Sequence, residues 1–466
     1  MGGSYSSTAV VGGHVSQGYE TVREMFRRNV ETGRERNAQL CVFVDGECVL
    51  DLWGSAEGDP DYTGDSLQCV FSTSKAVTAI AVAQLVDRGF LNYSNPVANY
   101  WPEFGAELKA SITVAEMLKH EGGMPHLHTA INYEDLLPHN LSNGRAASIL
   151  AQQRPLYPVD TPREYHNLTA GWVINEVFRR LAPDQQSLGA WLAREVAAPL
   201  EADVHLGLPD SLLPRVSQLS AMKRNTAIFH SILPNALGGQ IDYNILVFSK
   251  VLKSFDKRFV EPDPRGYVPD TPGDPSSDDV IDSMLGFLNS PVWRQGESPH
   301  GNVHASARGL ARLAAAMANK GRLGEVEIMS EAGWELLHQG DSVEVDAAMS
   351  GCRTQFTQAG VNKFEGYPDD RMGERSVLPQ YDTRETQTDS QLCLQDLQVW
   401  PGGFRRLAGV WRECDAVAPA AQPGLRLHLH SPLLVGPGKH QGQETTEGDR
   451  ALCPGSAGER GQQGWG

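Results

Sequence analysis

The sequence lacks any apolar run of the roughly 20 residues that a helix needs to cross a bilayer. It also lacks a positively charged segment followed by an apolar one at its start, so we expect no secretory signal. Gly2, directly after Met1, fits the pattern for N-myristoylation. No nearby cysteine or basic cluster supplies the second signal that stable anchoring needs. We therefore expect a cytoplasmic protein without a transmembrane segment, with acylation of Gly2 as its one candidate contact with a membrane.

Cysteine is scarce and scattered, with seven residues in a chain of 466. Their number is odd, and none of them lies in a C-x-x-C pair. Structural zinc sites and disulfide frameworks both depend on cysteines at short, regular spacings. We therefore expect no metal site, no disulfide framework and a reducing compartment. No motif for a cofactor was found either, so we expect none.

Positive charge is in deficit, since 40 lysines and arginines stand against 57 aspartates and glutamates, giving a net charge of −17. Nucleic acids and anionic membrane surfaces are bound by positive surfaces, so both are disfavoured as partners. The length exceeds one typical domain and allows a large buried core. These features favour a soluble enzyme whose partner is a small-molecule or peptide substrate.

The most informative motif is a serine three residues before a lysine, Ser72 and Lys75, at the start of an apolar helix. Positions i and i+3 of a helix share a face, so the lysine amine can reach the serine hydroxyl. Serine needs such a base to act as a nucleophile. Two other pairs share the spacing: Ser220 with Lys223, and Ser254 with Lys257. The first pair is selected because residues 76–86 after it are small and apolar on nearly every side, which predicts burial.

A second motif, Tyr165-His166-Asn167, offers a proton-transfer group and an amide. A tyrosine near the Lys75 ammonium can act as a phenolate or as a proton relay, if the cation lowers the pKa of the phenol. The Asn167 amide can hold a substrate carbonyl or the lysine. His166 lies between the two motif residues, so we expect its side chain to point away from theirs.

Other candidate groups are interpreted as structural. Tyr93-Ser94-Asn95 has the same Y-x-N spacing, but it precedes a proline and reads as the loop that closes the nucleophile helix. His120 lies in a loop next to two glycines. The chain contains no G-x-S-x-G, so a nucleophile elbow has no candidate serine.

With these motifs the chain resembles the β-lactamase-related serine hydrolases, a family that includes class C β-lactamases, penicillin-binding proteins and esterases of the same fold. The resemblance extends over residues 18–367. It rests on the two motifs and on four supporting runs in matching order, residues 42–46, 96–104, 112–125 and 305–313.

The resemblance implies an α/β (α+β) fold of two lobes, one an antiparallel sheet flanked by helices and the other mostly helical. It implies that Ser72 attacks a carbonyl from a helix start, where backbone N–H groups and the helix dipole favour an oxyanion. Lys75 and Tyr165 would remove and return the proton, and Asn167 would bind the substrate. An acyl-enzyme would form on an ester, amide or peptide and be released by water.

The resemblance, together with composition, divides the chain into a flexible N-terminus (residues 1–12), a β-lactamase-related domain (13–368) and a divergent tail (369–466). The tail is rich in Gly, Pro, Gln and charge, a composition typical of disorder. Within the domain, hydrophobic periodicity predicts helices at 19–30, 74–88, 114–119 and 306–319. It also predicts strands at 39–44 and 47–53, joined through Asp45-Gly46, a strong hairpin signal.

One departure from the family is serious, because its third motif, H/K/W-x-G on a strand, is missing soon after residues 356–364. His440-Gln441-Gly442 fits the letters, but its flanks do not predict a strand. In the family this strand completes the sheet and supplies part of the oxyanion hole. Two functions stay open: a serine hydrolase, and a non-catalytic or truncated relative with a binding or assembly role. We expect this form to be a poor hydrolase with an open sheet edge, which would favour self-association.

Overall fold

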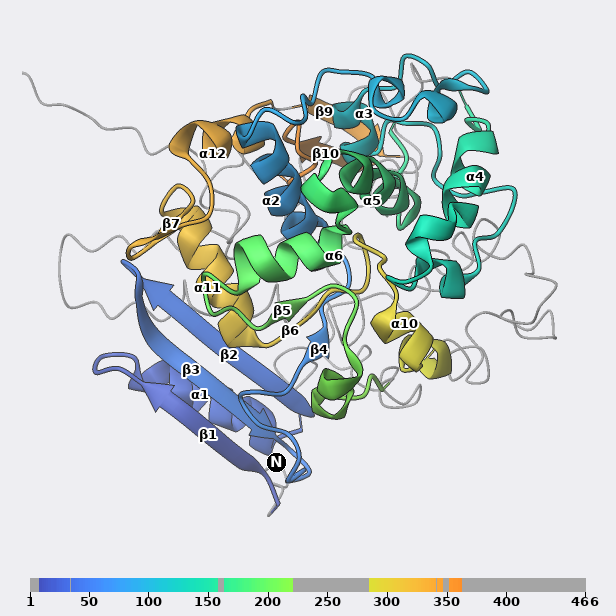
Figure 1. The fold of residues 1–466 in the computed structure, drawn as a ribbon. Helices are drawn as coiled ribbons and strands as arrows, with labels where there is room; N and C mark the ends of the chain where they lie inside the picture. The colour runs from blue at the N-terminus through green and yellow to red at the C-terminus, as the bar shows by residue number, and fades with distance from the viewer. Residues whose placement is uncertain are drawn as a thin grey trace, which may run out of the picture. The chain divides into compact units, whose positions relative to one another are not determined.

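A computed structural model describes residues 8–33, 35–157, 163–220, 285–340, 342–346 and 352–362 (Figure 1). The strands are β1 (Val10–Val15), β2 (Asn37–Val44), β3 (Glu47–Ser55), β4 (Gln68–Cys69), β5 (Val204–His205), β6 (His304–Ala305), β7 (Arg322–Leu323), β8 (Val326–Glu327), β9 (Ser342–Asp346) and β10 (Cys352–Phe356). The α-helices are α1 (Glu20–Glu31), α2 (Thr73–Asp87), α3 (Val114–Leu118), α4 (Arg145–Gln152), α5 (Thr169–Leu181), α6 (Leu188–Trp191), α10 (Pro291–Gln295), α11 (Ala307–Ala318) and α12 (Glu331–His338). Short 3₁₀ turns cover Val97–Asn99, Pro102–Gly105, Tyr133–Leu136, Leu141–Asn143, Pro183–Gln185 and Asp210–Arg215, and a π-helical turn covers Leu192–Ala197. The fold is of the α/β class with antiparallel sheets, as predicted.

The N-terminal sheet has the strand order β1-β3-β2 and contains the predicted hairpin. Asp45 and Gly46 have φ values of 51° and 84°, because a two-residue type I′ turn needs positive φ at both positions. Val10 pairs with Ser55 across β1 and β3. The flexible segment predicted over residues 1–12 is therefore wrong from Val10 onward, where ladder hydrogen bonds fix the backbone. Among the described strands, β2 has no partner on its other edge.

Helices cover both faces of this sheet. Leu40 on β2 and Leu52 on β3 are opposite each other and pack with Phe26 and Val30 of α1. The next pair, Cys41 and Asp51, faces the other way because successive strand residues alternate between faces. On that side Arg308 of α11 donates to Asp51 at 2.6 Å. The sheet is thus packed against α1 on one face and α11 on the other.

The helix α2 is buried among other helices, lying beside α5, α6 and α12 (Figure 1). Eleven of its fifteen residues are buried, which agrees with the apolar pattern after Lys75. Its polar Gln84 donates to the Ile328 carbonyl at 2.6 Å and accepts from the Trp191 indole at 2.7 Å. Because α2 is enclosed in this way, the position of Ser72 at its start is fixed.

The start of α2 is tied to a small sheet with the order β4-β6-β5. Cys69 on β4 pairs with His304 on β6. One residue further, the Val70 N–H donates to the Val303 carbonyl at 2.9 Å. The chain then turns through Phe71 into Ser72 and the helix.

Several predictions lie outside the described residues. They concern Gly2, Lys223, Ser254, Lys257, His440 and the tail 369–466. Within the described ranges, no helix has the length and apolar character needed to span a bilayer.

Candidate active site

Ser72 occupies the N-cap position of α2, but its side chain makes no capping hydrogen bond. Its backbone is already helical, with φ −67° and ψ −10°, whereas a capping serine normally has an extended backbone. The preceding residue, Phe71, has a φ of 44°. A bulky residue with positive φ is uncommon and tends to occur at functional sites. The turn therefore leaves the Ser72 hydroxyl without a capping hydrogen bond to the backbone of its own helix.

The structure brings three of the predicted site residues together. The Ser72 Oγ lies 2.7 Å from the Tyr165 hydroxyl and 3.4 Å from the Lys75 Nζ. The amine also lies over the Tyr165 ring, 4.6 Å from its centroid. All three residues are partly exposed.

Two backbone carbonyls hold the Lys75 amine. It donates to the Asn167 carbonyl at 2.8 Å and to the His300 carbonyl at 2.9 Å. Burial lowers the pKa of Lys75 well below its ordinary value. A neutral amine has two N–H donors and one lone pair. In that neutral form, with both donors used by the carbonyls, the lone pair would face the Ser72 hydroxyl.

The pKa of Tyr165 differs from the sequence prediction. Burial raises it, the hydrogen bond to Ser72 opposes that shift, and the charge of Asp346 adds to it. The prediction that a lysine ammonium would lower the pKa fails because burial also disfavours the charged form of Lys75. Tyr165 is thus suited to be a neutral proton donor and relay, and not a phenolate.

Asn167 contacts the site through its backbone. Its carbonyl oxygen, and not its amide, holds Lys75. The side-chain amide is partly exposed and makes no hydrogen bond to the described residues. It is therefore available for a substrate carbonyl.

The backbone N–H of Ser72 has no acceptor among the described residues. It stands at the N-terminus of α2, where the helix dipole favours negative charge. This N–H is a candidate oxyanion donor. The second donor, which we expected from a third motif soon after residues 356–364, falls beyond the described residues.

The histidines near the site do not contact Ser72. The His166 Nε2 accepts from the Met124 N–H at 2.8 Å, so the ring points away from the motif, as predicted. His120 is buried against Tyr165, with ring centroids 4.6 Å apart. Burial, followed by neighbouring charges, lowers the pKa of His120 and of His300 well below the ordinary value. Both rings are therefore neutral at pH 7.

An ion pair with a buried arginine supports the irregular segment that carries Tyr165. Arg163 donates to Glu121 at 2.5 Å, and also to the Thr354 carbonyl at 2.7 Å. The Asp346 carboxylate accepts from the Tyr165 N–H at 3.1 Å. The paired strands β9 and β10 are thereby attached to the segment that carries Tyr165. Sequence reasoning missed Arg163, Asp346 and the His300 carbonyl, and only the position of Arg163 beside the Y-x-N motif could have pointed to one of them.

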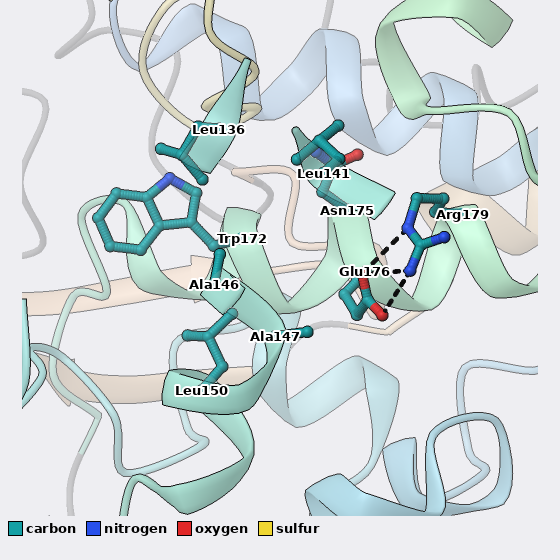
Figure 2. Close-up of a pocket in the computed structure, with 9 residues that line it drawn as sticks. All are labelled: Leu136, Leu141, Ala146, Ala147, Leu150, Trp172, Asn175, Glu176 and Arg179. Carbon is teal, nitrogen blue, oxygen red and sulfur yellow. Dashed lines mark hydrogen bonds and ion pairs between the residues drawn. The ribbon is translucent and has the colours of Figure 1, made fainter. Parts of the chain in front are cut away.

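A small apolar pocket lies beside α4 and α5 (Figure 2). Its lining is Leu136, Leu141, Ala146, Ala147, Leu150, Trp172, Asn175, Glu176 and Arg179. None of the residues around Ser72 lines it. Trp172 donates from this wall to the Ser298 hydroxyl at 3.0 Å, so the pocket is part of the packing behind the site. In the described ranges, no cluster of three His, Cys, Asp or Glu residues could hold a metal ion.

The chain is similar to known proteins in sequence and in fold. The profile of the family described as Beta-lactamase matches residues 22–360. The chain is 30% identical over 295 residues to the Esterase/beta-lactamase LipL of Mycobacterium tuberculosis. This match covers 62% of the present chain and 60% of LipL, so less than two thirds of that protein's length is spanned.

Two solved structures are similar in both sequence and fold. One is a penicillin-binding protein homologue from Caulobacter crescentus, with a TM-score of 0.59 and 27% identity, covering 77% of this chain and 84% of that one. The other is a family VIII carboxylesterase, with a TM-score of 0.58 and 27% identity, covering 75% and 82%.

Proposed function

Since the chain belongs to the Beta-lactamase family, we propose that it is a serine hydrolase that forms an acyl-enzyme on Ser72 and acts on esters. The observation that carries the proposal is the setting of the Lys75 amine. Two carbonyls take its donors, and the Ser72 Oγ lies 3.4 Å from it. A serine hydroxyl needs a neighbouring base to act as a nucleophile, and the Lys75 amine is close enough to be that base.

Acylation begins when Lys75 takes the Ser72 proton and the Ser72 Oγ forms a bond to the substrate carbonyl carbon. The carbonyl oxygen becomes an oxyanion, stabilised by the Ser72 N–H at the start of α2. The Tyr165 hydroxyl gives its proton to the leaving alcohol and is reprotonated from the Lys75 ammonium. The ester C–O bond breaks, the alcohol leaves, and Lys75 is again neutral.

Deacylation repeats these steps with water in place of serine. Tyr165 and Lys75 remove a proton from the water, which attacks the acyl carbon. The bond to the Ser72 Oγ breaks, and the proton returns to that oxygen. The acid product leaves, and the original protonation states are restored.

Esters are favoured over amides and peptides as the substrate class. One relative is called an esterase/beta-lactamase and a structural neighbour is a carboxylesterase. An alcohol is also a better leaving group than an amine, so an ester makes smaller demands on a site with one assigned oxyanion donor. The Asn167 amide would orient the acyl group by donating to it.

The alternative function is a non-catalytic relative with a binding or assembly role. It is favoured by the absence of an H/K/W-x-G motif soon after residues 356–364, where the resemblance to the family leads us to expect one. The two proposals differ in one property, the reactivity of Ser72.

Labelling with an activated fluorophosphonate separates them. We expect the probe to modify Ser72, with the position established by peptide mapping, and Ser72→Ala to abolish the labelling. A nitrophenyl ester then reports whether the acyl-enzyme turns over. An unlabelled Ser72 in a folded protein would contradict the hydrolase and favour the binding role.

A further inference from the structure

One loop supplies a carbonyl to the site and is bound by three side chains of α2. We call residues 297–303 the carbonyl loop. The Ser74 hydroxyl accepts from the Val303 N–H at 3.0 Å, and the Thr78 hydroxyl donates to the Pro299 carbonyl at 2.8 Å. Between them, Lys75 donates to the His300 carbonyl at 2.9 Å. Three side chains from neighbouring turns of α2 thus form hydrogen bonds with backbone groups of the carbonyl loop.

Asn302 fixes the same loop from within. Its Oδ1 accepts from the Ser298 N–H at 2.9 Å. Its Nδ2 donates to the Trp293 carbonyl at 2.6 Å and the Gly296 carbonyl at 2.8 Å. Asn302 is 1% exposed, and a buried amide with its hydrogen bonds made in this way stabilises a single conformation.

The carbonyl loop also reaches the helical lobe. Glu297 is buried and accepts from the Gly189 N–H at 3.2 Å and from the Asn175 amide at 3.3 Å. The Ser298 hydroxyl accepts from Trp172. The position of the His300 carbonyl is therefore determined by contacts on both sides.

We infer that the carbonyl loop sets the direction of the Lys75 lone pair, and that Thr78 and Asn302 are positioning residues for this purpose. The inference rests on the proposed function, because it concerns the base that activates Ser72. Neither residue contacts the Ser72 Oγ. They act through the His300 carbonyl, which takes one amine donor and so leaves the lone pair facing the serine.

The test compares Thr78→Val with Thr78→Ser by the rate at which a fluorophosphonate labels Ser72, measured across pH. Valine keeps the shape and removes the hydroxyl, so the Pro299 carbonyl loses its donor. We expect labelling at neutral pH to fall by about tenfold or more, because small misplacements of a catalytic group are costly. The pH below which the labelling rate falls should rise. The reason is that water reaching the amine relieves its desolvation and so raises the pKa of Lys75. Thr78→Ser should restore both the labelling rate at neutral pH and the pH at which that rate falls. Asn302→Asp, which replaces the two N–H donors with a carboxylate oxygen and adds a negative charge, should also lower the labelling rate.

Ser330→Ala is the matched control at the other end of α2. The Ser330 hydroxyl donates to Asp87 and caps α12, so the variant loses a partly buried hydrogen bond far from Lys75. Its labelling rate should equal that of the wild type. Wild-type labelling in Thr78→Val, or an equal loss in Thr78→Ser, would overturn the positioning role while leaving the hydrolase intact. Absence of labelling in the wild type would instead refute the proposed function.

A second inference is independent of the active site and concerns two thiols of the N-terminal hairpin. The Sγ atoms of Cys41 on β2 and Cys48 on β3 lie 3.8 Å apart. The strand register is irregular between Val42 and Phe43, which brings the two positions together diagonally. Cys41 is buried and Cys48 is partly exposed, so a reagent in solution can reach one member of the pair.

The geometry points to Cys41 and Cys48 as a redox-sensitive pair that closes to a disulfide when a small-molecule disulfide such as oxidised glutathione is present. The Cys48 thiolate attacks the reagent, forming a mixed disulfide and releasing one glutathione thiolate. Cys41 then loses its proton to solvent and attacks the Cys48 sulfur, releasing the second glutathione. Two protein thiols are oxidised and one reagent disulfide is reduced. Burial raises the pKa of the Cys41 thiol, so the second displacement is the slow step.

Peptide mapping after oxidation tests this pair, because cleavage after Glu47 separates the two cysteines. We expect a cross-linked pair of peptides with a mass loss of about 2 Da that a reductant reverses. Cys69, buried without a thiol partner among the described cysteines, serves as the internal control and should stay reduced. In Cys41→Ser the oxidation should stop at the mixed disulfide between Cys48 and glutathione. A stable mixed disulfide in the wild type, with no cross-link, would overturn the inference.

Discussion

The starts of α2 and α11 are built alike but use their serines differently. Each helix follows a strand of the same small sheet, β4 and β6, which pair with each other. Ser306 has an extended backbone, and its hydroxyl accepts from the Gly309 N–H at 3.1 Å, as an ordinary cap does. Ser72 is helical, caps nothing, and meets Tyr165 and Lys75. One hydroxyl stabilises its helix, and the other is left for chemistry.

The difference has a structural cost at α2. The first turn lacks its cap, and Phe71 takes a positive φ of 44°. Such departures from local preference persist where the surrounding structure enforces them, and they cluster at functional sites. Here the burial of α2 and its contacts with the carbonyl loop provide that enforcement. The comparison teaches that an uncapped serine in a rigid setting is a better sign of function than the S-x-x-K spacing alone.

The largest effect should come from Ser72→Ala. We expect ester hydrolysis and phosphonate labelling to fall by a factor on the order of 10⁴ or more, since the nucleophile is removed. Because the hydroxyl caps nothing, the urea midpoint should change little. A large loss of stability with retained hydrolysis would mean that Ser72 is a cap like Ser306.

Removing the proton-transfer groups should have the next largest effect. Lys75→Ala should lower kcat by on the order of 10³, and Tyr165→Phe by about 10² or more. Because the two act on one proton, the double variant should lose less than the product of the single losses. Stopped assays on purified variants would measure this. Wild-type rates in either single variant would refute the relay.

Acidification should destabilise the protein through its buried histidines. Burial lowers the pKa of His166 from 6.5 to about 4, and His120 and His300 shift in the same direction. Below pH 6.5 these histidines become protonated in the unfolded chain but stay neutral in the folded protein. The free energy of unfolding should therefore fall as the pH drops from 6.5 toward 4.

Glu297 acts with the opposite sign in much of this window and provides a control. Burial raises the pKa of its carboxyl from 4.5 to about 7. Between these values the folded protein keeps a proton that the unfolded chain has released, so this group favours folding more as pH falls. In Glu297→Gln the loss of stability on acidification should therefore be steeper. Urea midpoints at several pH values would show it, and an unchanged slope would contradict the shift.

The smallest effect should come from Ser306→Ala, which removes a cap and no chemistry. We expect a loss of about 1 kcal/mol in the free energy of unfolding, the usual value for an N-cap serine. Hydrolysis below the unfolding transition should equal that of the wild type. A loss of hydrolysis in the folded Ser306→Ala variant would contradict the conclusion that Ser306 serves only as a cap.

Much of this site could be predicted from the sequence because its key residues lie on regular elements. The i, i+3 spacing placed Lys75 beside Ser72, and the apolar run after it predicted a buried helix. The hairpin at Asp45-Gly46 was readable from turn chemistry. The backbone carbonyls of Asn167 and His300 could not be foreseen, because every residue has a carbonyl and only the fold selects two of them. The strand β1 was missed because Gly12 and Gly13 interrupt its pattern.

The central claim is that Ser72 is activated by a neutral lysine, and the pH dependence of its labelling tests this most directly. The rate constant for phosphonate labelling of Ser72 should be at its full value near neutral pH and fall only below the lowered pKa of Lys75. In Lys75→Ala that limb should disappear and the rate should stay low. A wild-type rate that instead climbs until pH passes 10.5, the ordinary lysine value, would show that the amine is charged at neutral pH and would contradict the account.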